Sequence, residues 1–526
     1  MSHLQQSTHS PWQKLIGPVF PRLNSDIKTD VCVIGSGISG LTTAYLLLQK
    51  GFQVAVIDKE SFGNCETGFS TAHITSALDD RFAQLRRWHG DDGLRLAYES
   101  HHEAIKLIER IVRDEHIECE FEKVDGYLFQ GEPNSTGPLD VELEAIHAAG
   151  FTDVKLLDRA PVSFFESGPC LQFPNQAQFH PLKYLQGLLR VIRRSGGEVY
   201  QQTKAVEVKG GPLAFVKTEQ GFKISCRHIV VATNVPINDL VTMHTKEAAY
   251  RTYVIGMKVP QGEVTPALFW DTEDPYHYVR IERVPGQDYD LLIVGGEDHR
   301  VGQNDNPQRL YLNLEDWTRL RLGLTGEIVY RWSGQIIEPI DGLAYIGRNP
   351  GDEDNVYIAS GDSGNGITHG SVAGMILSDL IAGQVNPWAS LYDPRRFNWK
   401  GLGTYARENW KGASKYADWL TVQDRRRPEE LLPGEGAILS DGIGKIAVYR
   451  DEEGYLHEFS AACPHLKGML HWNSLEKTWD CPFHGSRFNP VGEVLNGPAF
   501  SNMSPKETSH LTTPPSKKPE QEKPLQ

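Results

Sequence analysis

The chain has 526 residues, of which 39% are hydrophobic and 23% are charged, and its formal net charge is −15 at pH 7. This length exceeds what one hydrophobic core can serve and predicts about three domains, while the acidic balance argues against a nucleic-acid partner. We expect no membrane span, because no apolar run approaches the roughly 20 residues that a spanning helix needs.

The cysteines are scattered along the chain and odd in number. The seven positions are Cys32, Cys65, Cys119, Cys170, Cys226, Cys463 and Cys481. This usage fits a reducing cytoplasm better than a disulfide framework. The chain start also lacks the basic and apolar regions of a signal peptide, so we predict a cytoplasmic protein.

The first predicted elements are an arm and a dinucleotide-binding fingerprint. Residues 1–27 are polar, carry three prolines and are predicted to form an extended arm. An apolar run typical of a buried parallel strand follows. It leads into Gly35, Gly37 and Gly40 and then a helical stretch, and a second apolar run ends at Asp58.

This fingerprint suits a dinucleotide ligand. Its glycines allow a tight turn and let the N–H groups at the helix start approach a pyrophosphate, while Asp58 can accept hydrogen bonds from a ribose. An acidic residue here would repel a 2′-phosphate, which disfavours an NADP-type ligand. FAD and NAD share the pattern, so the choice between them depends on later segments.

Three later segments favour a flavin. Residues 63–72 form a glycine- and hydroxyl-rich loop, and residues 227–234 are typical of another buried strand. A third segment, residues 341–370, contains a strand and a glycine-rich loop that opens a helix. The positive end of that helix could face the negative charge of a reduced flavin. The alternative for residues 361–370 is a plain strand-to-helix turn.

These pieces resemble the FAD-dependent amine and amino-acid oxidase family, which includes D-amino-acid oxidase, glycine oxidase and sarcosine oxidase, over residues 28–395. The resemblance implies an α/β Rossmann-type FAD-binding domain with an interleaved α+β substrate domain. The FAD-binding pieces would span residues 28–80, 160–235 and 336–395, and the substrate domain residues 81–159 and 236–335. The implied FAD-binding residues are Gly35, Gly37, Ile38, Ser39, Gly40, Asp58, Lys59, Ser70, Thr71, Ala72, Val206, Ala232, Thr233, Gly364, Gly366, Ile367 and Thr368.

The two insertions supply the candidate substrate pocket. Residues 99–113 have helical periodicity, while residues 276–281 and 291–296 are predicted to be neighbouring strands. The catalytic candidates are Arg280, Tyr278, His299 and Arg331, with Tyr276 and Trp332 beside them. An arginine can grip a carboxylate in bidentate fashion, and aromatic rings can cage an amine. The alternative is that these are surface arginines and core tyrosines. Residues 101–103 are expected on a solvated helix face.

A connector is predicted at residues 396–421, an all-β domain at 422–500 and a disordered tail at 501–526. The domain carries Cys463 and His465, then Cys481 and His484, with 15 residues between the two pairs. Two thiolates and two imidazoles can hold a 2Fe-2S cluster with both histidines on one iron, and this pattern resembles the Rieske motif. The alternative is a structural zinc site with the same ligands.

The resemblance to Rieske proteins also bears on the cluster potential. High-potential members carry a disulfide between the two cluster loops, and here Lys467 or Gly468 and Phe483 stand at those positions. Ser486, which would hydrogen-bond a sulfur, is kept, whereas Phe488 stands where a tyrosine is expected. Fewer hydrogen bonds predict an intermediate or low potential within a range of about −150 to +300 mV.

The whole chain resembles bacterial FAD-dependent oxidoreductases that carry a carboxy-terminal Rieske domain. We expect an enzyme that oxidises an amine or amino-acid C–N bond with FAD and passes electrons singly through the cluster to an external acceptor protein. Two alternatives stay open. A partner reductase could feed the cluster so that the flavin reduces a substrate, or the protein could be a redox carrier or sensor without a substrate.

Overall fold

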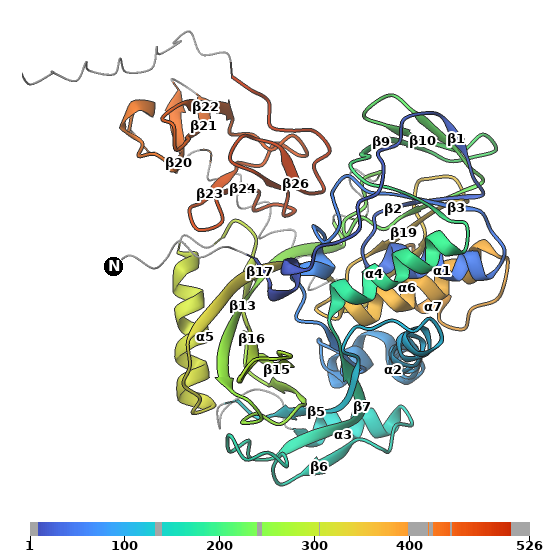
Figure 1. Cartoon of the computed structure of the whole chain (residues 1–526), viewed down its shortest axis with the longest axis vertical. Helices are drawn as coiled ribbons and strands as arrows, with labels where there is room; N and C mark the ends of the chain where they lie inside the picture. The colour runs from blue at the N-terminus through green and yellow to red at the C-terminus, as the bar shows by residue number, and fades with distance from the viewer. Residues whose placement is uncertain are drawn as a thin grey trace, which may run out of the picture. The chain divides into compact units, whose positions relative to one another are not determined.

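The computed structural model describes residues 9–131, 139–238, 243, 245–303, 306–397, 419, 424, 426–441 and 444–506. It divides into two compact units, Met1–Lys411 and Gly412–Gln526, which we describe separately (Figure 1). Most of the predicted connector at residues 396–421 lies outside the described residues.

The first unit contains a six-stranded sheet of the Rossmann type, as predicted. Its strand order is β18 (Tyr345–Arg348), β19 (Val356–Ser360), β12 (His228–Val231), β2 (Val31–Ile34), β3 (Val54–Ile57) and β8 (Glu198–Tyr200). All pairs are parallel except β18 with β19. Every residue of β2 and β3 is buried. Helices α1 (Ile38–Gln49), α4 (Pro181–Arg194) and α6 (Gly366–Ile381) cover one face of the sheet (Figure 1), and on the other face Cys32, Ile34 and Ile57 share a core with Val216 and Ile224.

A small sheet extends this half of the unit. It contains β1 (Ile27–Lys28), β11 (Lys223–Ser225), β10 (Phe215–Thr218) and β9 (Ala205–Lys209), in that order. The preceding residues are not a plain extended arm as predicted. They include the 3-10 turn η1 (Pro11–Lys14), in which the Trp12 side chain is only 1% exposed.

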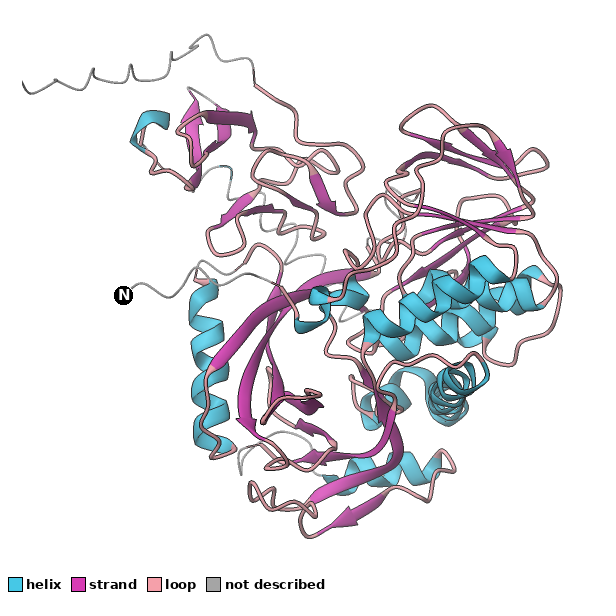
Figure 2. Ribbon diagram, viewed as in Figure 1, coloured by secondary structure: helices cyan, strands magenta, loops and turns pink. Residues whose placement is uncertain are grey.

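The second sheet of the unit is large and curved (Figure 2). Its order is β17 (Ile328–Pro339), β13 (Glu247–Pro260), β16 (Tyr289–Arg300), β15 (Tyr278–Arg283), β14 (Leu268–Asp271), β5 (Glu122–Phe129), β7 (Cys170–Gln178) and β4 (His73–Ile74), with β6 (Lys155–Leu157) paired to β7. The predicted pairing of residues 276–281 with 291–296 is confirmed by the antiparallel β15–β16 ladder. Helix α5 (Pro307–Arg321) packs against β13 and β16 on one face.

The remaining helices differ partly from expectation. The predicted helix at residues 99–113 lies within α2 (Phe82–Asp114), which packs against α6 as well as α3 (Leu139–Ala148). His101 was expected on a solvated face, but it is completely buried, with its ring 4.4 Å from that of His369 on α6. The prediction was wrong because α6 covers the side of α2 on which His101 lies.

The second unit is all-β, as predicted. One sheet has the order β20 (Gly436–Asp441), β21 (Gly444–Arg450) and β22 (Leu456–Ser460), and the other β23 (His471–Asn473), β24 (Thr478–Asp480), β25 (Arg487–Phe488) and β26 (Val494–Asn496). The predicted tail is ordered at its start, because Pro505 bridges to Phe459 and Met503 is 2% exposed. The rest of that tail lies outside the described residues.

Candidate cofactor and substrate sites

In the glycine loop after β2, the backbone packs so closely against neighbouring backbone atoms that a side chain would not fit. Gly35 has φ +108°, and a Cβ at this position would lie 2.3 Å from the carbonyl oxygen of Ala232. A Cβ at Gly40 would lie 2.0 Å from the Gly35 carbonyl oxygen. At the end of β3, the Asp58 carboxylate accepts hydrogen bonds of 2.7 Å from both the N–H and the hydroxyl of Ser36. The loop therefore fits the pyrophosphate and ribose of a dinucleotide.

The predicted flavin-side loop, residues 70–72, is held by the second sheet. The indole of Trp332 donates a 2.8 Å hydrogen bond to the carbonyl oxygen of Phe69. The guanidinium of Arg280 donates from Nη1 to the carbonyl oxygens of Thr71 and Ala72, at 3.1 Å each. Ala72 has φ +60°. The loop conformation thus depends on side chains from β15 and β17.

The start of α6 lies beside the same loop. The Thr368 hydroxyl donates a 3.1 Å hydrogen bond to the carbonyl oxygen of Thr75 and accepts one of 3.3 Å from the Thr75 N–H. Gly364 has φ +68°, and a Cβ there would lie 2.6 Å from a carboxylate oxygen of Asp79. The fold therefore joins two segments predicted to hold the flavin, although the bonded threonines are 293 positions apart in the sequence.

Other predicted FAD-binding positions differ in their surroundings. Ala232 lies next to Gly35 through its carbonyl oxygen, and the Thr233 hydroxyl donates to the Val235 carbonyl oxygen at 2.7 Å. Burial lowers the pKa of Lys59. Val206 lies in β9 with 51% of its surface exposed, so a contact with an adenine ring would be made at the surface of the small sheet.

Two of the four catalytic candidates lie on the face of the second sheet that α5 covers. Arg331 contacts Glu315 of α5 at 3.4 Å. The ring of His299 stacks on Tyr253 at 5.5 Å, and Tyr253 meets Tyr311 of α5. Arg331 and His299 therefore lie on the face that α5 covers, whereas Trp332 lies on the opposite face. Their pocket roles stay predictions.

Arg280 does lie on the inner face, where both of its Nη atoms already have partners in the fold. Besides Thr71 and Ala72, its Nη1 donates to the carbonyl oxygen of Phe179 at 3.1 Å, and its Nη2 contacts the Glu282 carboxylate. The side chain is 1% exposed. Arg280 therefore clamps the flavin-side loop through Nη1, and its predicted grip on a substrate carboxylate stays a prediction.

Tyr278, the fourth candidate, lies near a cavity between the second sheet and the start of α6. We call it the Asp79 cavity; it holds only about 20 Å³, and its lining includes Asp79, Arg81, Trp270, Tyr276 and Asn365. The Tyr278 ring lies 5.6 Å from that of Tyr276, and its hydroxyl is 2.6 Å from that of Thr252. His73, at the end of the flavin-side loop, has its ring 5.9 Å from Trp270. Among the residues that line the cavity, the sequence predicted only Tyr276.

Half-buried carboxyl groups lie at or near the Asp79 cavity, and of Asp79, Asp80 and Glu338 only Asp79 lines it. Burial and the adjacent Asp80 raise the pKa of Asp79 to about 7, and burial raises the pKa of Asp80 to about 6. Burial together with Asp80 and Asp79 raises the pKa of Glu338 well above its usual value. The Ser363 hydroxyl lies 2.9 Å from carboxylate oxygens of both Asp80 and Glu338.

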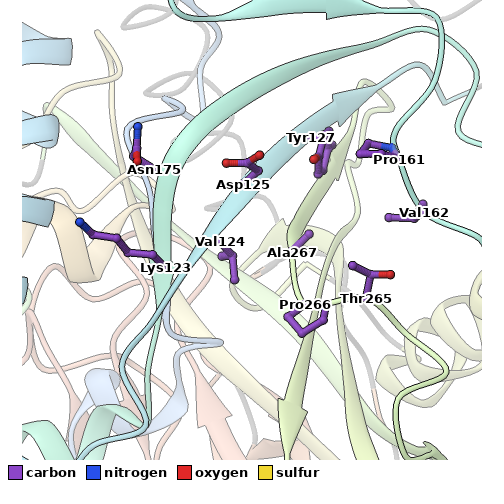
Figure 3. A pocket seen from close by; sticks show the side chains of 10 residues that line it. All are labelled: Lys123, Val124, Asp125, Tyr127, Pro161, Val162, Asn175, Thr265, Pro266 and Ala267. Carbon is purple, nitrogen blue, oxygen red and sulfur yellow. The ribbon is translucent and has the colours of Figure 1, made fainter.

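A second, more open cavity of about 340 Å³ lies elsewhere in the first unit. Figure 3 shows its lining residues, which include Lys123, Asp125, Tyr127 and Pro266. Lys123 forms an ion pair of 2.7 Å with Glu109. Asp125 accepts a 2.7 Å hydrogen bond from Gln172, so both charged side chains already have partners in the fold.

In the second unit, the two predicted cluster loops lie together. Cys463 and Cys481 are 0% and 2% exposed, and the rings of His465 and His484 are 5.1 Å apart. The loops close on themselves, since Lys467 N–H donates to the Cys463 carbonyl and Gly485 N–H to that of Cys481, both at 3.0 Å. A hydrogen bond from Cys481 lowers the pKa of Cys463, and the same contact raises the pKa of Cys481. A thiolate of lowered pKa suits iron ligation.

Gly468 and Phe483 stand where high-potential Rieske proteins have a disulfide, and here the two residues pack against each other. A Cβ at Gly468 would lie 2.4 Å from the Phe483 ring. Phe488 is fully buried. The Ser486 hydroxyl accepts a 3.0 Å hydrogen bond from the Ala499 N–H. The two loops are thus braced by an aromatic ring over a glycine, in place of a covalent bond.

Comparison with known proteins identifies the family. Residues 30–380 match the family described as FAD dependent oxidoreductase, and residues 426–514 match the Rieske [2Fe-2S] domain. The chain belongs to the FAD-dependent oxidoreductase family. Its cofactors are therefore FAD and a Rieske 2Fe-2S cluster, and the glycine loop and the Cys–His loops have the residues that these groups need. The zinc alternative is set aside.

Individual members of the family and solved structures agree with this assignment. The chain is 34% identical over 491 residues to "Putative Rieske 2Fe-2S iron-sulfur protein YhfW" of Bacillus subtilis, covering 92% of this chain and 95% of that protein. It is 25% identical over 378 residues to "Gamma-glutamylputrescine oxidoreductase" of Escherichia coli, covering 69% and 86% of the two chains. Glycine oxidase from Geobacillus kaustophilus superposes with a TM-score of 0.58 at 16% identity, covering 71% of this chain and all of that one.

The chain is thus an FAD-dependent oxidoreductase of the amine and amino-acid oxidase type with a Rieske domain. Within the part of the chain that the structure describes, no helix is long and apolar enough to cross a membrane.

Proposed function

We propose that this oxidoreductase oxidises the C–N bond of an amine or amino acid, with hydride transfer to FAD, and passes the electrons singly through the 2Fe-2S cluster to an external acceptor protein. FAD supplies the conversion between two-electron and one-electron chemistry. The pairing of the two cofactors in one chain supports this function, since an oxidase that reacts directly with oxygen would not need the cluster.

The observation that carries the proposal is the joining of the predicted flavin segments beside the second sheet. The Thr368 hydroxyl at the start of α6 is hydrogen-bonded to the backbone of Thr75, and Asn365 accepts a 3.1 Å hydrogen bond from the Asp79 N–H. Trp270 of β14 and Tyr276 line the Asp79 cavity beside these segments, and their aromatic rings can contact an amine.

The proposed reaction balances without a nucleophilic side chain. The substrate carbon loses a hydride and the amine nitrogen loses a proton, which leaves an imine that water hydrolyses to a carbonyl compound and ammonia. The two electrons leave the protein in two single-electron steps. His73 lies by the cavity and is suited to remain neutral, because burial lowers its pKa to about 3.

Anaerobic titration of the purified holoenzyme tests this function. An amine and amino-acid panel should bleach the flavin absorbance, and the EPR signal of a reduced 2Fe-2S cluster should follow. In a Cys481→Ser variant, bleaching should persist while reduction of a one-electron dye slows. Reduction only by a protein reductase, with no response to any small molecule, would instead support the carrier alternative. Reduction by a reductase followed by turnover of an imine would support the reductive alternative.

A further inference from the structure

We infer that Arg487 is a positioning residue for the 2Fe-2S cluster. Its buried ion pair with Asp480 fixes the loop that carries Cys481, His484 and Ser486, and the position of this loop in turn sets the reduction potential. This role belongs to the second unit alone and is independent of the substrate that the flavin oxidises.

The loop that carries Cys481 is the turn of a hairpin, and the ion pair lies at its base. Strand β24 ends at Asp480 and β25 begins at Arg487, and these two residues are directly opposed in the antiparallel ladder. Nε of Arg487 donates a 3.0 Å hydrogen bond to the Asp480 carboxylate. The loop is therefore closed by the two members of one ion pair.

The ion pair is buried and has further partners beside it. Arg487 is 5% exposed and Asp480 is 3% exposed. Nη2 of Arg487 donates to the Thr478 hydroxyl at 2.9 Å and contacts the Glu476 carboxylate. The Thr478 hydroxyl in turn donates to the Asp480 carboxylate at 2.8 Å, and the Asn473 amide donates to it at 3.4 Å. A buried network of this kind holds the two strand ends rigidly.

Stability alone does not account for charged groups at the base of the loop. The desolvation of two buried charges costs free energy that their attraction repays only in part, so an apolar pair of similar volume is often as stable. On the other face of the same strands, Trp479 and Phe488 form such a pair and belong to the apolar core that contains Cys481. Directional hydrogen bonds fix an orientation that apolar packing leaves less defined.

Ser486 connects the ion pair to the sulfur ligands. It directly precedes Arg487, and its carbonyl oxygen accepts a 2.8 Å hydrogen bond from the Cys481 N–H. Its hydroxyl accepts a hydrogen bond from the Ala499 N–H at 3.0 Å, so the hydroxyl proton can be donated to a sulfur atom. Hydrogen bonds from Cys481 and, to a smaller extent, from Ser486 lower the pKa of Cys463. Because Arg487 fixes the adjacent backbone, it keeps the Ser486 hydroxyl directed at the sulfur.

EPR-monitored redox titration of the full-length holoprotein tests this role in the double variant Arg487→Gln/Glu476→Gln. The variant removes one positive and one negative charge, so the local net charge is kept and a change in potential reports the position of the loop. Loss of the Ser486 hydrogen bond should shift the reduction equilibrium about tenfold toward the oxidised cluster, which is a fall of about 59 mV for one electron. Arg487→Lys has one nitrogen in place of the planar fork and should give a smaller fall.

A Ser486→Ala background separates positioning from a direct effect of the ion pair. There the double variant should lower the potential by less than half as much as in the wild type, because the hydroxyl through which Arg487 acts is gone. Arg426→Gln, which breaks a surface ion pair, is the control and should leave the potential unchanged.

An unchanged potential in the double variant would overturn the role of Arg487. An equal fall with and without the Ser486 hydroxyl would overturn it as well, because the ion pair would then act on the cluster by another route. Iron and labile sulfide per chain show whether each variant holds its cluster. If the double variant does not, the same comparison is made with Arg487→Lys, and a wild-type potential in that variant overturns the role.

Discussion

The indole Nε1 of Trp12 donates a 2.8 Å hydrogen bond to the carbonyl oxygen of Ser70. The Trp12 ring also lies 5.0 Å from the ring of His180 and 5.5 Å from the guanidinium of Arg280. Just before it in the chain, the Ser10 hydroxyl donates to the Gly68 carbonyl oxygen at 2.6 Å. The amino-terminal segment is therefore part of the support under the flavin-side loop.

We predict that Trp12→Phe weakens FAD binding about fivefold, because it keeps the ring but removes a hydrogen bond worth about 1 kcal/mol. Trp12→Ala should also destabilise the first unit by about 3–5 kcal/mol through loss of buried ring volume. Fluorescence titration of apoprotein with FAD measures the first effect and thermal unfolding the second. Trp388→Phe is the control, since the Trp388 indole nitrogen has no hydrogen-bond partner among the described residues. Equal FAD affinity in Trp12→Phe and wild type would contradict the prediction.

Arg280→Lys should reduce the FAD content of the purified protein. A lysine has one nitrogen and cannot reproduce the guanidinium contacts with Thr71, Ala72 and Phe179. We expect the flavin-loaded fraction to retain the substrate Kd of the wild type, because the Arg280 Nη atoms hold the flavin-side loop. The measurements are the FAD-to-protein ratio and anaerobic substrate titration, with Arg331→Lys as the control on the other face. A normal FAD content with a much weaker substrate Kd would support the carboxylate-gripping role.

His277 should make the stability of the first unit depend on pH. Burial lowers its pKa, but the 2.8 Å hydrogen bond to Asp271 and the nearby carboxylates of Glu297 and Glu273 outweigh burial and raise the pKa to about 9. Since the folded pKa exceeds the unfolded value of about 6.5, the stabilisation is complete below pH 6.5 and disappears as the pH rises through 9. The effect should amount to about 1–3 kcal/mol.

Denaturant unfolding of wild type and His277→Gln between pH 6 and pH 9.5 checks this prediction. The difference in unfolding free energy between the two proteins should shrink as the pH rises. His457→Gln, in the second unit, is the control, because its contact with Asp451 lies at the surface. A difference that is constant across this range would show that His277 stays neutral.

The local motifs could be predicted because their function depends on residues close together in sequence. Gly35 and Gly40 lie within one turn, and each Cys–His pair lies within one loop, so spacing alone indicates the geometry. The pocket residues could not be assigned in this way. Arg331 and Trp332 are adjacent in sequence, yet they lie on opposite faces of β17. Because both faces of this sheet are covered, the alternation of hydrophobic and polar residues does not show which side chains point toward the flavin-side loop.

The acidic groups near the Asp79 cavity show the same limit. Asp79 and Asp80 directly precede Arg81, and a short run of charged residues is typical of a solvated turn. In the fold, however, the Asp80 carboxylate accepts a hydrogen bond from Ser363, 283 positions later in the chain, and Ser363 also bonds to Glu338. No local pattern contains that information, because it arises only when α6 and β17 meet the loop.

Phe488→Tyr should raise the reduction potential of the cluster. Phe488 is fully buried in the core of the second unit with Cys463 and Cys481, so a hydroxyl there would be shielded from water and could donate to sulfur. A hydrogen bond to a charged acceptor is worth about 1.5–3 kcal/mol, which corresponds to a rise of about 60–130 mV for one electron. EPR-monitored redox titration measures the potential, with Phe459→Tyr in β22 as the control. No rise, or a fall, would count against the predicted role of this position.

Gly468→Ala should release the cluster by separating the two loops. The new Cβ would lie 2.4 Å from Cδ2 of Phe483, and that ring is only 7% exposed, so it has little room to move. We expect the iron and labile sulfide bound per chain to fall and the thermal midpoint of the second unit to drop. A double-mutant cycle with Phe483→Ala tests this prediction. The space left by the Phe483 ring should relieve the clash made by the new methyl group at residue 468.

In that cycle, Phe483→Ala alone should destabilise the unit by about 3–5 kcal/mol through the cavity it leaves. Adding Gly468→Ala to Phe483→Ala should then cost less than it does in the wild type, because its methyl group would enter the space vacated by the ring. If the losses of stability caused by the two substitutions add, Gly468 is needed for its backbone conformation and Phe483 does not brace the loops. A smaller combined loss identifies the Phe483–Gly468 contact as the substitute for the disulfide of high-potential Rieske proteins.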